Sequence, residues 1–283
     1  MARPDVAPLT AGSTRVRQAS HLSKRAVRAR RREFLAEGPP SVREALQRAG
    51  AVREVFATAS IEVRHPELRA AAGAQGVSWH SVADDVVAAL TDTVTPQGVV
   101  ARCAFVDVTA AALLARVPRL LALLHEVRDP GNAGTVLRCA DAAGADGLLL
   151  SGSSVDPYNS KAVRASAGSL FHLPLVTGVA LEATVSALRD NGLRVLAADA
   201  GGDVDLAVAS DRGALRGPAV WLFGNEARGL SEESRSLADS VVRVPLYGRA
   251  ESLNLASAAA VCLYASAWAQ RRPGGCRAGR PEQ

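Results

Sequence analysis

The sequence predicts an α/β protein with two domains, and three observations support this prediction. The chain has 283 residues, a length that allows one large domain or two ordinary ones. Short apolar segments of strand length alternate with segments that have the apolar spacing of helices. Hydrophobic residues make up 48% of the chain and aromatic residues 4%, so the core is expected to be aliphatic and rich in alanine. That composition disfavours an aromatic-rich β-sandwich.

The N-terminal end of the chain is basic. Residues 1–20 contain Pro, Gly, Ser and Thr without apolar periodicity, which predicts a flexible basic arm. Residues 22–32 have a basic helical pattern. Residues 6–32 include no acidic residue, and their eight basic residues are Arg15, Arg17, Lys24, Arg25, Arg28, Arg30, Arg31 and Arg32. The segment is either a solvated tail or an arm that contacts phosphates, and both can hold at once. With the net charge of +5, it favours a polyanionic partner.

Residues 21–106 are predicted to form the first domain. Ser41 and Glu44 have the spacing of a capping box, so a helix is expected to begin at Ser41. Residues 107–118 are expected to link this domain to the next, although their alanines could also extend a helix. Strands are predicted at residues 33–38, 55–58, 77–79 and 99–105, and helical patterns lie between them, which predicts an α/β unit.

Residues 119–270 are predicted to form the second domain, followed by a disordered tail at 271–283. The apolar run at 120–127 fits a buried parallel strand. After it, Asn132 is a plausible N-cap for the next helix. Ser252 is expected to open the last helix of the domain.

Three loops of unusual composition are expected to form one binding site. Residues 129–134 and 224–229 each follow an apolar run of strand length, and residues 242–258 predict a strand, a Pro/Gly loop and a helix. In an open α/β sheet, loops that follow strand ends meet at one edge, where ligands bind. A helix N-terminus in such a loop also offers unpaired backbone N–H groups to a polar ligand.

Several other classes of protein are disfavoured. The four cysteines, Cys103, Cys139, Cys262 and Cys276, have no paired spacing, so we expect neither a metal site nor a disulfide framework. No run of 18 apolar residues and no signal peptide is present, which predicts a cytoplasmic protein without a membrane span. The absence of a Gly-x-Gly-x-x-Gly motif after a strand argues against an ordinary Rossmann site.

The three loops also resemble the three motifs of the SpoU (TrmH) family of RNA ribose 2′-O-methyltransferases, which belong to the SPOUT class. The matching residues run from Asn132 to Arg138, then Leu222-Phe-Gly-Asn-Glu226, then Val244-Pro-Leu with Ser252-Leu-Asn254. The motifs occur in the family's order, within a resemblance that covers roughly the last 165 residues of the chain. In addition, Thr95-Pro-Gln-Gly98 is similar to the sequence that ends the small RNA-binding domain of SpoU proteins.

The resemblance implies a fold and an assembly. The first domain would be a small α/β RNA-binding domain like that of certain ribosomal proteins. The second would be a SPOUT domain whose C-terminal segment passes through an earlier loop to form a deep trefoil knot, which is otherwise essentially absent from proteins. Members of the class are typically homodimers that pair through the knotted region.

The reaction implied by the resemblance is methyl transfer from S-adenosylmethionine to a ribose 2′-hydroxyl. A sulfonium methyl donor needs no metal, so the protein must supply position and a more nucleophilic oxygen. By resemblance, the cofactor would contact the backbone at Gly224, Val244 and Leu253, while Leu222, Phe223 and Leu246 would line the adenine slot. Without the motif, core packing would be the preferred interpretation of Val244 and Leu253.

The acceptor side is implied by the same resemblance. Arg138 matches the residue that the family places at the hydroxyl, with Asn132 beside it, and the remaining polar motif positions are Glu226, Ser252 and Asn254. Family accounts make this arginine a general base, yet a guanidinium is effectively always protonated in proteins. We therefore expect Arg138 to anchor a phosphate and stabilise the developing alkoxide.

RNA is the expected partner, with ribosomal RNA favoured over transfer RNA because of the N-terminal domain. The residues expected to contact it are Arg25, Arg28, Arg30, Arg31, Arg32 and Arg164. The alternatives are a transfer-RNA ribose methyltransferase, a SPOUT enzyme that methylates a base, and a non-catalytic RNA-binding protein. The intact polar motif positions argue against the last of these, and Asn132 with Arg138 favours ribose chemistry over base chemistry. The sequence identifies neither the target nucleotide, nor a role in antibiotic resistance, nor the general base, nor the subunit that supplies Asn132 and Arg138.

Overall fold

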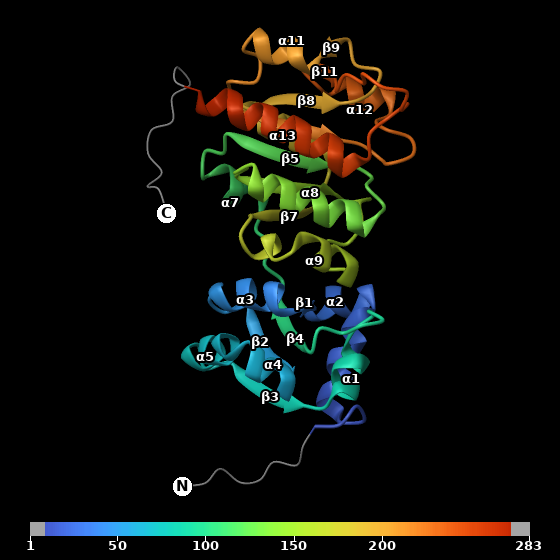
Figure 1. Cartoon of the computed structure of the whole chain (residues 1–283). Helices are drawn as coiled ribbons and strands as arrows, with labels where there is room; N and C mark the ends of the chain where they lie inside the picture. The colour runs from blue at the N-terminus through green and yellow to red at the C-terminus, as the bar shows by residue number, and fades with distance from the viewer. Residues whose placement is uncertain (1–8, 273–283) are drawn as a thin grey trace. The chain divides into compact units, whose positions relative to one another are not determined.

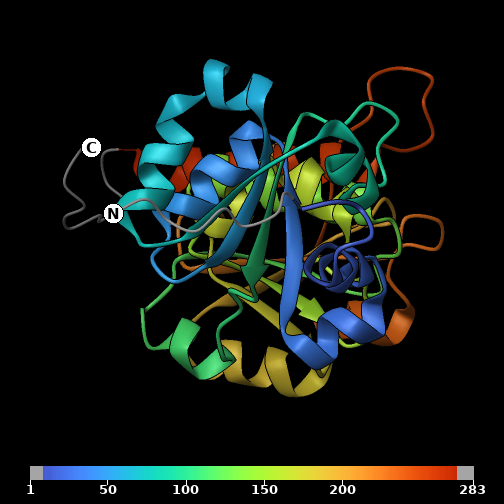
Figure 2. The ribbon, with the colours of Figure 1, turned by 90° about the horizontal axis from the view of Figure 1, so that it is seen from below.

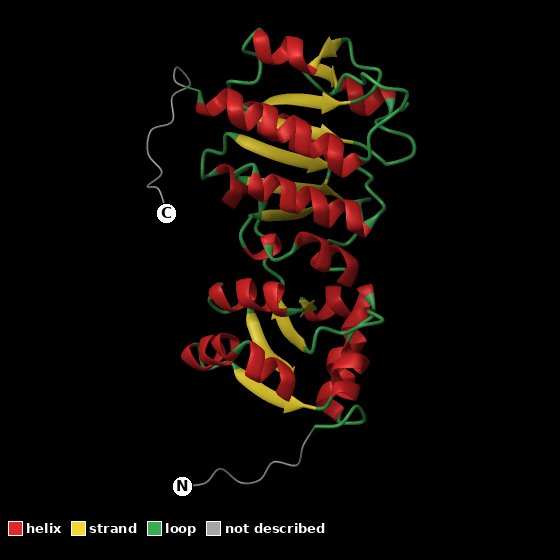
Figure 3. Ribbon diagram, in the orientation of Figure 1, coloured by secondary structure: helices red, strands yellow, loops and turns green. Residues whose placement is uncertain are grey.

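The computed structural model describes residues 9–272 and divides them into two compact units (Figure 1). Unit 1 comprises residues up to Val106 together with Asp156–Phe171, and unit 2 comprises Asp107–Val155 and the chain from His172 onward. Both units combine helices with a β-sheet (Figure 3), as the sequence predicts.

Unit 1 is built on a four-stranded sheet in the order β1-β4-β2-β3. Strand β4 is antiparallel to both of its neighbours, whereas β2 and β3 run parallel. Helices α1 and α6 pack on the face of the sheet that carries Phe56 and Val100. The elements are α1 (Thr14–Ser20), a 3-10 turn (His21–Ser23), α2 (Arg25–Arg31), β1 (Glu33–Glu37), α3 (Pro39–Gln47), β2 (Val52–Thr58), α4 (Ala59–Arg64), α5 (Pro66–Ala74), β3 (Ser78–Val82), α6 (Asp84–Leu90), β4 (Val99–Ala104) and α9 (Ser160–Ser166).

Unit 2 contains a seven-stranded sheet in the order β7-β6-β5-β10-β8-β11-β9, in which all neighbouring strands are parallel. The central strands are apolar on both faces because helices cover both, as expected for a parallel sheet. The elements are α7 (Ala110–Leu114), β5 (Leu120–Leu124), α8 (Pro130–Ala142), β6 (Gly147–Ser151), β7 (Leu175–Val179), α10 (Leu181–Asp190), β8 (Arg194–Ala198), β9 (Val204–Asp205), α11 (Leu206–Asp211), β10 (Ala219–Phe223), α12 (Glu232–Ser236), β11 (Ser240–Arg243) and α13 (Leu255–Arg271).

The two faces of the unit 2 sheet carry different helices. Leu113 of α7 and Val185 of α10 share one core cluster with side chains from β5, β8 and β10. On the other face, Trp221 of β10 donates a hydrogen bond from its indole N–H to the Ser266 hydroxyl of α13, over 2.9 Å. Helix α13, in red, and helix α10, in gold, accordingly lie on opposite sides of the sheet in Figure 2. Helices α13 and α8 are neighbours on their face, so the C-terminal helix covers the central strands (Figure 1).

Three predicted boundaries differ from the structure. Residues 14–20, expected in a flexible arm, form α1, because Val16 and Ala19 are buried against the core of unit 1. Residues 107–118, expected as a linker, include α7, whose Leu113 is fully buried in unit 2. Arg271 ends α13, and the rest of the predicted tail from residue 273 lies outside the described residues, as do residues 1–8.

Segment Asp156–Phe171 joins unit 1 through a buried aromatic cluster. The Tyr158 ring stacks on Phe105 with a centroid distance of 3.8 Å and lies 4.8 Å from Phe34. Its phenol oxygen accepts a hydrogen bond from the Val106 amide over 3.0 Å. Arg28 binds the Asp156 carboxylate at 2.7 Å. The sequence prediction assigned this segment to the second domain, because nothing local in it indicates these distant contacts.

Candidate active site

The carboxyl ends of the central strands of unit 2 border a cavity of about 350 Å³. Strands β8, β10 and β11 are parallel, so the loops that follow them meet at one edge of the sheet. The cavity walls combine apolar and charged side chains, and come from residues 198–200, 223–229 and 242–258. The loops after β10 and β11 are two of the three that the sequence predicts as a shared site.

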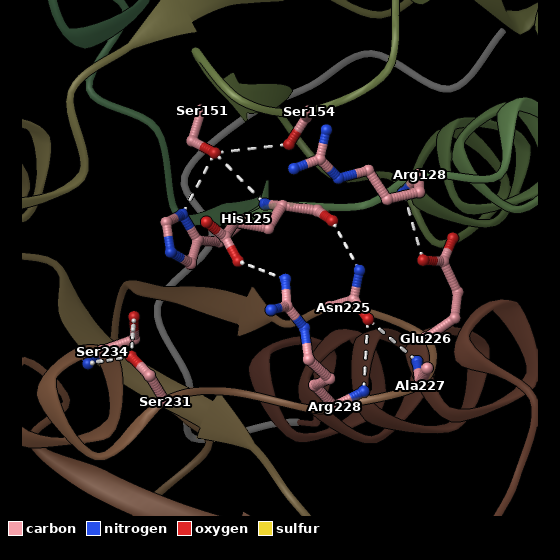
Figure 4. Close-up of polar contacts among 11 residues, drawn as sticks. His125, Arg128, Ser151, Ser154, Asn225, Glu226, Ala227, Arg228, Ser231 and Ser234 are labelled. Atoms are coloured by element: carbon pink, nitrogen blue, oxygen red, sulfur yellow. Dashed lines mark hydrogen bonds and ion pairs between the residues drawn. The ribbon is translucent and has the colours of Figure 1, made fainter.

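The loop after β10 is a tight hairpin closed by two backbone hydrogen bonds, Asn225 N–H to the Gly229 carbonyl at 3.0 Å and Gly229 N–H to the Asn225 carbonyl at 2.9 Å. The Asn225 side chain holds it further, because its oxygen accepts the Ala227 amide and its nitrogen donates to the Glu126 carbonyl (Figure 4). A Cβ on Gly224 would lie 2.5 Å from the backbone of Gly229. The close approach that requires glycine there is therefore to this hairpin.

Glu226 joins this hairpin to the loop after β5. Its carboxylate accepts hydrogen bonds from the backbone amides of Asp129 at 2.9 Å and Arg128 at 3.1 Å, the second of which is drawn in Figure 4. It also accepts one from the Asn132 side-chain nitrogen at 3.2 Å. Burial raises the pKa of Glu226, but the hydrogen bonds from the Asp129, Arg128 and Glu226 amides and from the Asn132 side chain together more than offset it, so the pKa lies below the ordinary glutamate value. The side chain is therefore an anionic acceptor at neutral pH.

Asn132 extends the connection to the third loop. Its side-chain oxygen accepts a hydrogen bond from the Asn254 side-chain nitrogen over 3.0 Å. Glu226, Asn132 and Asn254 thus form a continuous chain of side-chain hydrogen bonds across the three predicted motifs. Residues 94 and 122 positions apart in the sequence are held together beside the cavity.

Two helix starts near the site differ from the prediction. Asp129, rather than Asn132, caps α8, because its carboxylate accepts the Asn132 backbone amide at 2.8 Å. Asn254, rather than Ser252, caps α13, and its side-chain oxygen accepts the amides of Ala256 and Ser257. Ser252 instead lines the cavity from the preceding loop. The side-chain oxygen of Asn132 and the side-chain nitrogen of Asn254 are therefore not used for capping, and they bond to each other.

Arg138 lies on α8 with an exposed side chain. It makes no hydrogen bond or ion pair with any residue in the range 9–272 that the structure describes, and it does not line the cavity of its own chain. An uncommitted guanidinium is available to an anion or to a second molecule.

Most of the residues predicted to bind a cofactor lie on the cavity wall, namely Phe223, Gly224, Val244, Leu246 and Leu253. Leu222 does not line it; its side chain is fully buried in the core on the face of α10. Sequence analysis missed Asp199, the first residue after β8, and Arg228, in the hairpin. The Arg228 guanidinium lies 3.4 Å from the Glu126 carboxylate (Figure 4). Position after a strand end was the one signal that could have found Asp199.

Comparisons with known proteins identify the family. Residues 119–264 match the model of the SpoU rRNA Methylase family, and residues 13–101 match the MRM3-like substrate binding domain. The chain is 34% identical over 258 residues to the Bacillus subtilis 23S rRNA (guanosine(2553)-2′-O)-methyltransferase RlmP, covering 90% of this chain and 96% of that one. The chain belongs to the SpoU rRNA methylase family.

Other SpoU proteins agree with this membership. A Streptomyces viridochromogenes 23S rRNA (uridine(2479)-2′-O)-methyltransferase is 40% identical over 148 residues, half of each chain. The crystal structure of the SpoU methyltransferase AviRb from the same species, in complex with the cofactor AdoMet, aligns with a TM-score of 0.77 at 31% identity over 90% of this chain and 98% of that one. The AdoMet-bound rRNA methyltransferase from Sinorhizobium meliloti also gives 0.77, at 31% identity over 92% and 96%.

The arginines predicted to contact RNA have different surroundings in this SpoU chain. Arg28 is only 3% exposed, and its guanidinium binds the Asp156 carboxylate and the carbonyls of Leu22 and Ser23. Its predicted role as an RNA contact is therefore wrong. Arg25 and Arg30 are exposed on α2.

The other three predicted arginines each have an internal contact. The Arg31 guanidinium donates to the Gln18 carbonyl at 2.9 Å. The Arg32 guanidinium lies 4.8 Å from the centre of the Phe105 ring. Arg164 donates to the Glu37 carboxylate at 3.2 Å.

The described residues also bear on the predictions about metal ions and membrane spans. Among residues 9–272, no cluster of three or more His, Cys, Asp or Glu side chains is arranged to hold a metal ion. No helix within that range is long and apolar enough to cross a membrane.

Proposed function

We propose that this protein methylates a ribose 2′-hydroxyl of ribosomal RNA, with S-adenosylmethionine as the methyl donor. The observation that carries the proposal is the Glu226–Asn132–Asn254 chain of hydrogen bonds beside the cavity. It links the three SpoU motifs in one arrangement, and the relatives of known name are 23S rRNA 2′-O-methyltransferases.

The cavity fits S-adenosylmethionine by its volume and lining. Leu246 and Leu253 are 39% and 40% exposed, so they leave apolar surface at the wall that an adenine ring can cover. Within the described chain, residues 246–253 form no backbone hydrogen bonds, which leaves their N–H and C=O groups open to the polar edge of the base. When bound, the cofactor supplies an activated methyl group on a sulfonium.

The charged groups of the cavity also match the cofactor. Asp199 and Glu226 are its acidic residues, and Arg228 is the one cation among its lining residues. S-adenosylmethionine carries a positive ammonium, a positive sulfonium and a negative carboxylate. The two acidic residues can pair with its positive groups, and Arg228 can pair with its carboxylate. Arg228 would receive the carboxylate.

We assign the acceptor side to Arg138 and its neighbours. The transfer forms a bond between the methyl carbon and the ribose oxygen and releases the hydroxyl proton, so negative charge develops on that oxygen. A guanidinium that stays protonated stabilises this charge and can bind the adjacent phosphate, but it is a poor proton acceptor. Glu226 and Asn254 hold Asn132, and through it the start of α8, in a fixed position.

The exposed arginines of α2 support an RNA partner. Arg25 and Arg30 lie on a seven-residue helix that contains four arginines and no acidic residue. Phosphate contacts of this kind supply much of the affinity of proteins for nucleic acid. With Arg28 withdrawn into an internal ion pair, Arg25 and Arg30 are the stronger candidates for the backbone contacts.

We propose that the active form is a homodimer that pairs through the face of α8 and α13. Val261 and Trp268 are 42% and 64% exposed on α13, and the Tyr264 ring lies 5.6 Å from that of Trp268. Such an exposed apolar stripe is typical of an interaction surface. Arg138 projects from the neighbouring helix without a partner among the described residues, so a second subunit can complete a site that one chain leaves open. The trefoil knot and a cytoplasmic location remain predictions.

The proposal is tested by transfer of labelled methyl from S-adenosylmethionine to ribosomal RNA from cells that lack this protein. Wild type should label one nucleotide, and Arg138→Ala should lose at least about 100-fold in rate, the effect of removing one preorganised charge-stabilising group. Transfer to transfer RNA alone would favour that alternative. RNA binding without transfer would favour the non-catalytic one.

A further inference from the structure

Unit 1 contains a second cavity, of about 160 Å³, that the methyl-transfer site does not use. Its lining residues all belong to unit 1, and they include Glu37, Ser41, Thr93 and Arg164. The volume is well below the roughly 300–1,000 Å³ of a site for a drug-sized ligand, so a single ring system fits and a whole nucleotide does not.

The cavity has a charged acceptor on its wall. The Glu37 side chain is 8% exposed, accepts from Arg164 at 3.2 Å, and also accepts from the Thr93 hydroxyl. An ionised carboxylate has about four lone-pair sites, so two remain available after these bonds. Arg164 is itself one-third exposed, which leaves guanidinium N–H groups free to donate at the same place.

Ser41 provides a second, independent sign of a ligand. It is only 4% exposed, it lines the cavity, and its hydroxyl forms no hydrogen bond with any residue between 9 and 272. The residue is buried, but its hydroxyl oxygen is not one of the fully buried polar atoms that lack a partner, so a ligand or water in the cavity can hydrogen-bond to it. Glu37 also has a structural role, because its bond from Thr93 holds loop 91–98 to β1. That role does not involve the Ser41 hydroxyl.

The surroundings favour RNA as the source of the ligand. Val94, in the middle of the loop that forms one wall, is fully exposed and can contact a neighbouring base. Proteins recognise unpaired RNA bases by splaying them out, stacking on them and bonding to their polar edges. This step rests on the proposed RNA substrate.

We propose that this cavity binds one unpaired guanine of the RNA. Guanine presents two adjacent donors, N1–H and N2–H, next to the acceptor O6. A carboxylate beside a guanidinium matches that edge, with Glu37 accepting and Arg164 donating. Uracil lacks the amino group, and adenine presents an acceptor to the carboxylate. The Ser41 hydroxyl can bond to either kind of group.

The test uses the full-length protein and end-labelled heptanucleotides in which a central guanosine, inosine or uridine is flanked by three uridines on each side. Anisotropy titration should show that wild type binds the guanosine oligomer at least about fivefold more tightly than the uridine oligomer. Inosine, which lacks only the 2-amino group, should fall between them.

Two variants and one control separate recognition from folding. Glu37→Gln should remove the guanosine preference and leave binding of the uridine oligomer unchanged. Ser41→Ala removes a hydroxyl without a protein partner, so it should lower the preference without lowering the Tm. Glu33→Gln, at the other end of β1, should keep the preference. Equal affinity of wild type for guanosine and uridine, or an equal loss for both oligomers in Glu37→Gln, would overturn the assignment.

Methyl transfer to ribosomal RNA is measured on the same preparations. Transfer without a guanosine preference overturns the guanine cavity and leaves the proposed function standing. A guanosine preference without transfer to any RNA supports the cavity and contradicts the function. Loss of both contradicts both.

Discussion

The arginines of helix α2 have different roles although the sequence presents them alike. Arg28 is enclosed by Asp156 and two carbonyl groups, whereas Arg30, half a turn away, is exposed. A basic helical pattern identifies the helix, but the partner of Arg28 lies 128 residues further along the chain. The ion pair therefore could not be predicted from local spacing.

Replacing Arg28 tests this difference. Arg28→Ala leaves the Asp156 carboxylate buried without its partner, so the free energy of unfolding should fall by about 3 kcal/mol. Urea unfolding measures the change. Arg30→Ala is the matched control and should stay within about 0.5 kcal/mol of wild type. Equal stability of the two variants would contradict the internal role of Arg28.

The pKa of Glu226 leads to a prediction about pH. A lowered pKa in the folded protein means that the carboxylate stabilises the fold above its unfolded pKa, near about 4.3, and that this contribution is lost as pH falls through the lower folded value. The unfolding free energy of Glu226→Gln should therefore fall less steeply than that of wild type between about pH 5 and 3. Parallel pH profiles would show that the amide contacts add no stability.

The motif residues show how far sequence reasoning reaches at this scale. Asn132, Glu226 and Asn254 were selected by resemblance and are joined in the structure by direct hydrogen bonds. Asp199 and Arg228 were missed because their position on the cavity wall depends on strand order and on a hairpin, and neither belongs to a short motif.

At the scale of elements, the type of element was predicted better than its ends. The Ser41 capping box is wrong, because Gly38 with φ 88° and Pro39 at the first helical position start α3 two residues earlier. Glycine at position 38 suits that left-handed turn, and Ser41 is left free for the second cavity. Near each helix start the sequence contains several residues that can act as N-caps. Which of them caps the helix depends on the local backbone conformation, which the sequence pattern does not specify.

The cap of α13 is predicted to affect both stability and activity. Asn254→Ala removes the cap and the contact to Asn132, so unfolding free energy should fall by about 1 kcal/mol. Methyl transfer should fall as well. Ser231→Ala removes a comparable cap from α12 and should lower stability by a similar amount while transfer continues. If both variants retain full transfer, the Asn132–Asn254 contact does not position the site.

At the scale of the whole molecule, the two α/β units follow from the alternating pattern, but their limits do not. Segment Asp156–Phe171 joins unit 1 through Tyr158 and Arg28, although the chain on both sides of it belongs to unit 2. Such an excursion leaves no local signal. The exposed apolar stripe on α13 could not be predicted either, because both faces of an alanine-rich helix are apolar and the sequence does not indicate which face is exposed to solvent.

Assembly is tested by changing that stripe. Trp268→Glu places a charge on the proposed interface and should convert a dimer of 29.3 kDa chains into monomers in light scattering. Val208→Glu, at an exposed apolar position on α11, is the matched control and should remain dimeric. A wild type that is monomeric at micromolar concentration would contradict the proposal.

The most direct test of ribose methylation is a single-atom change in the acceptor. Once the labelled nucleotide is mapped, a ribosomal RNA fragment is made with 2′-deoxyribose at that position alone. The account predicts that methyl transfer disappears while the fragment binds as before. Methyl label that persists on the deoxynucleotide would place the reaction on the base and contradict the assignment of Arg138 to a ribose hydroxyl.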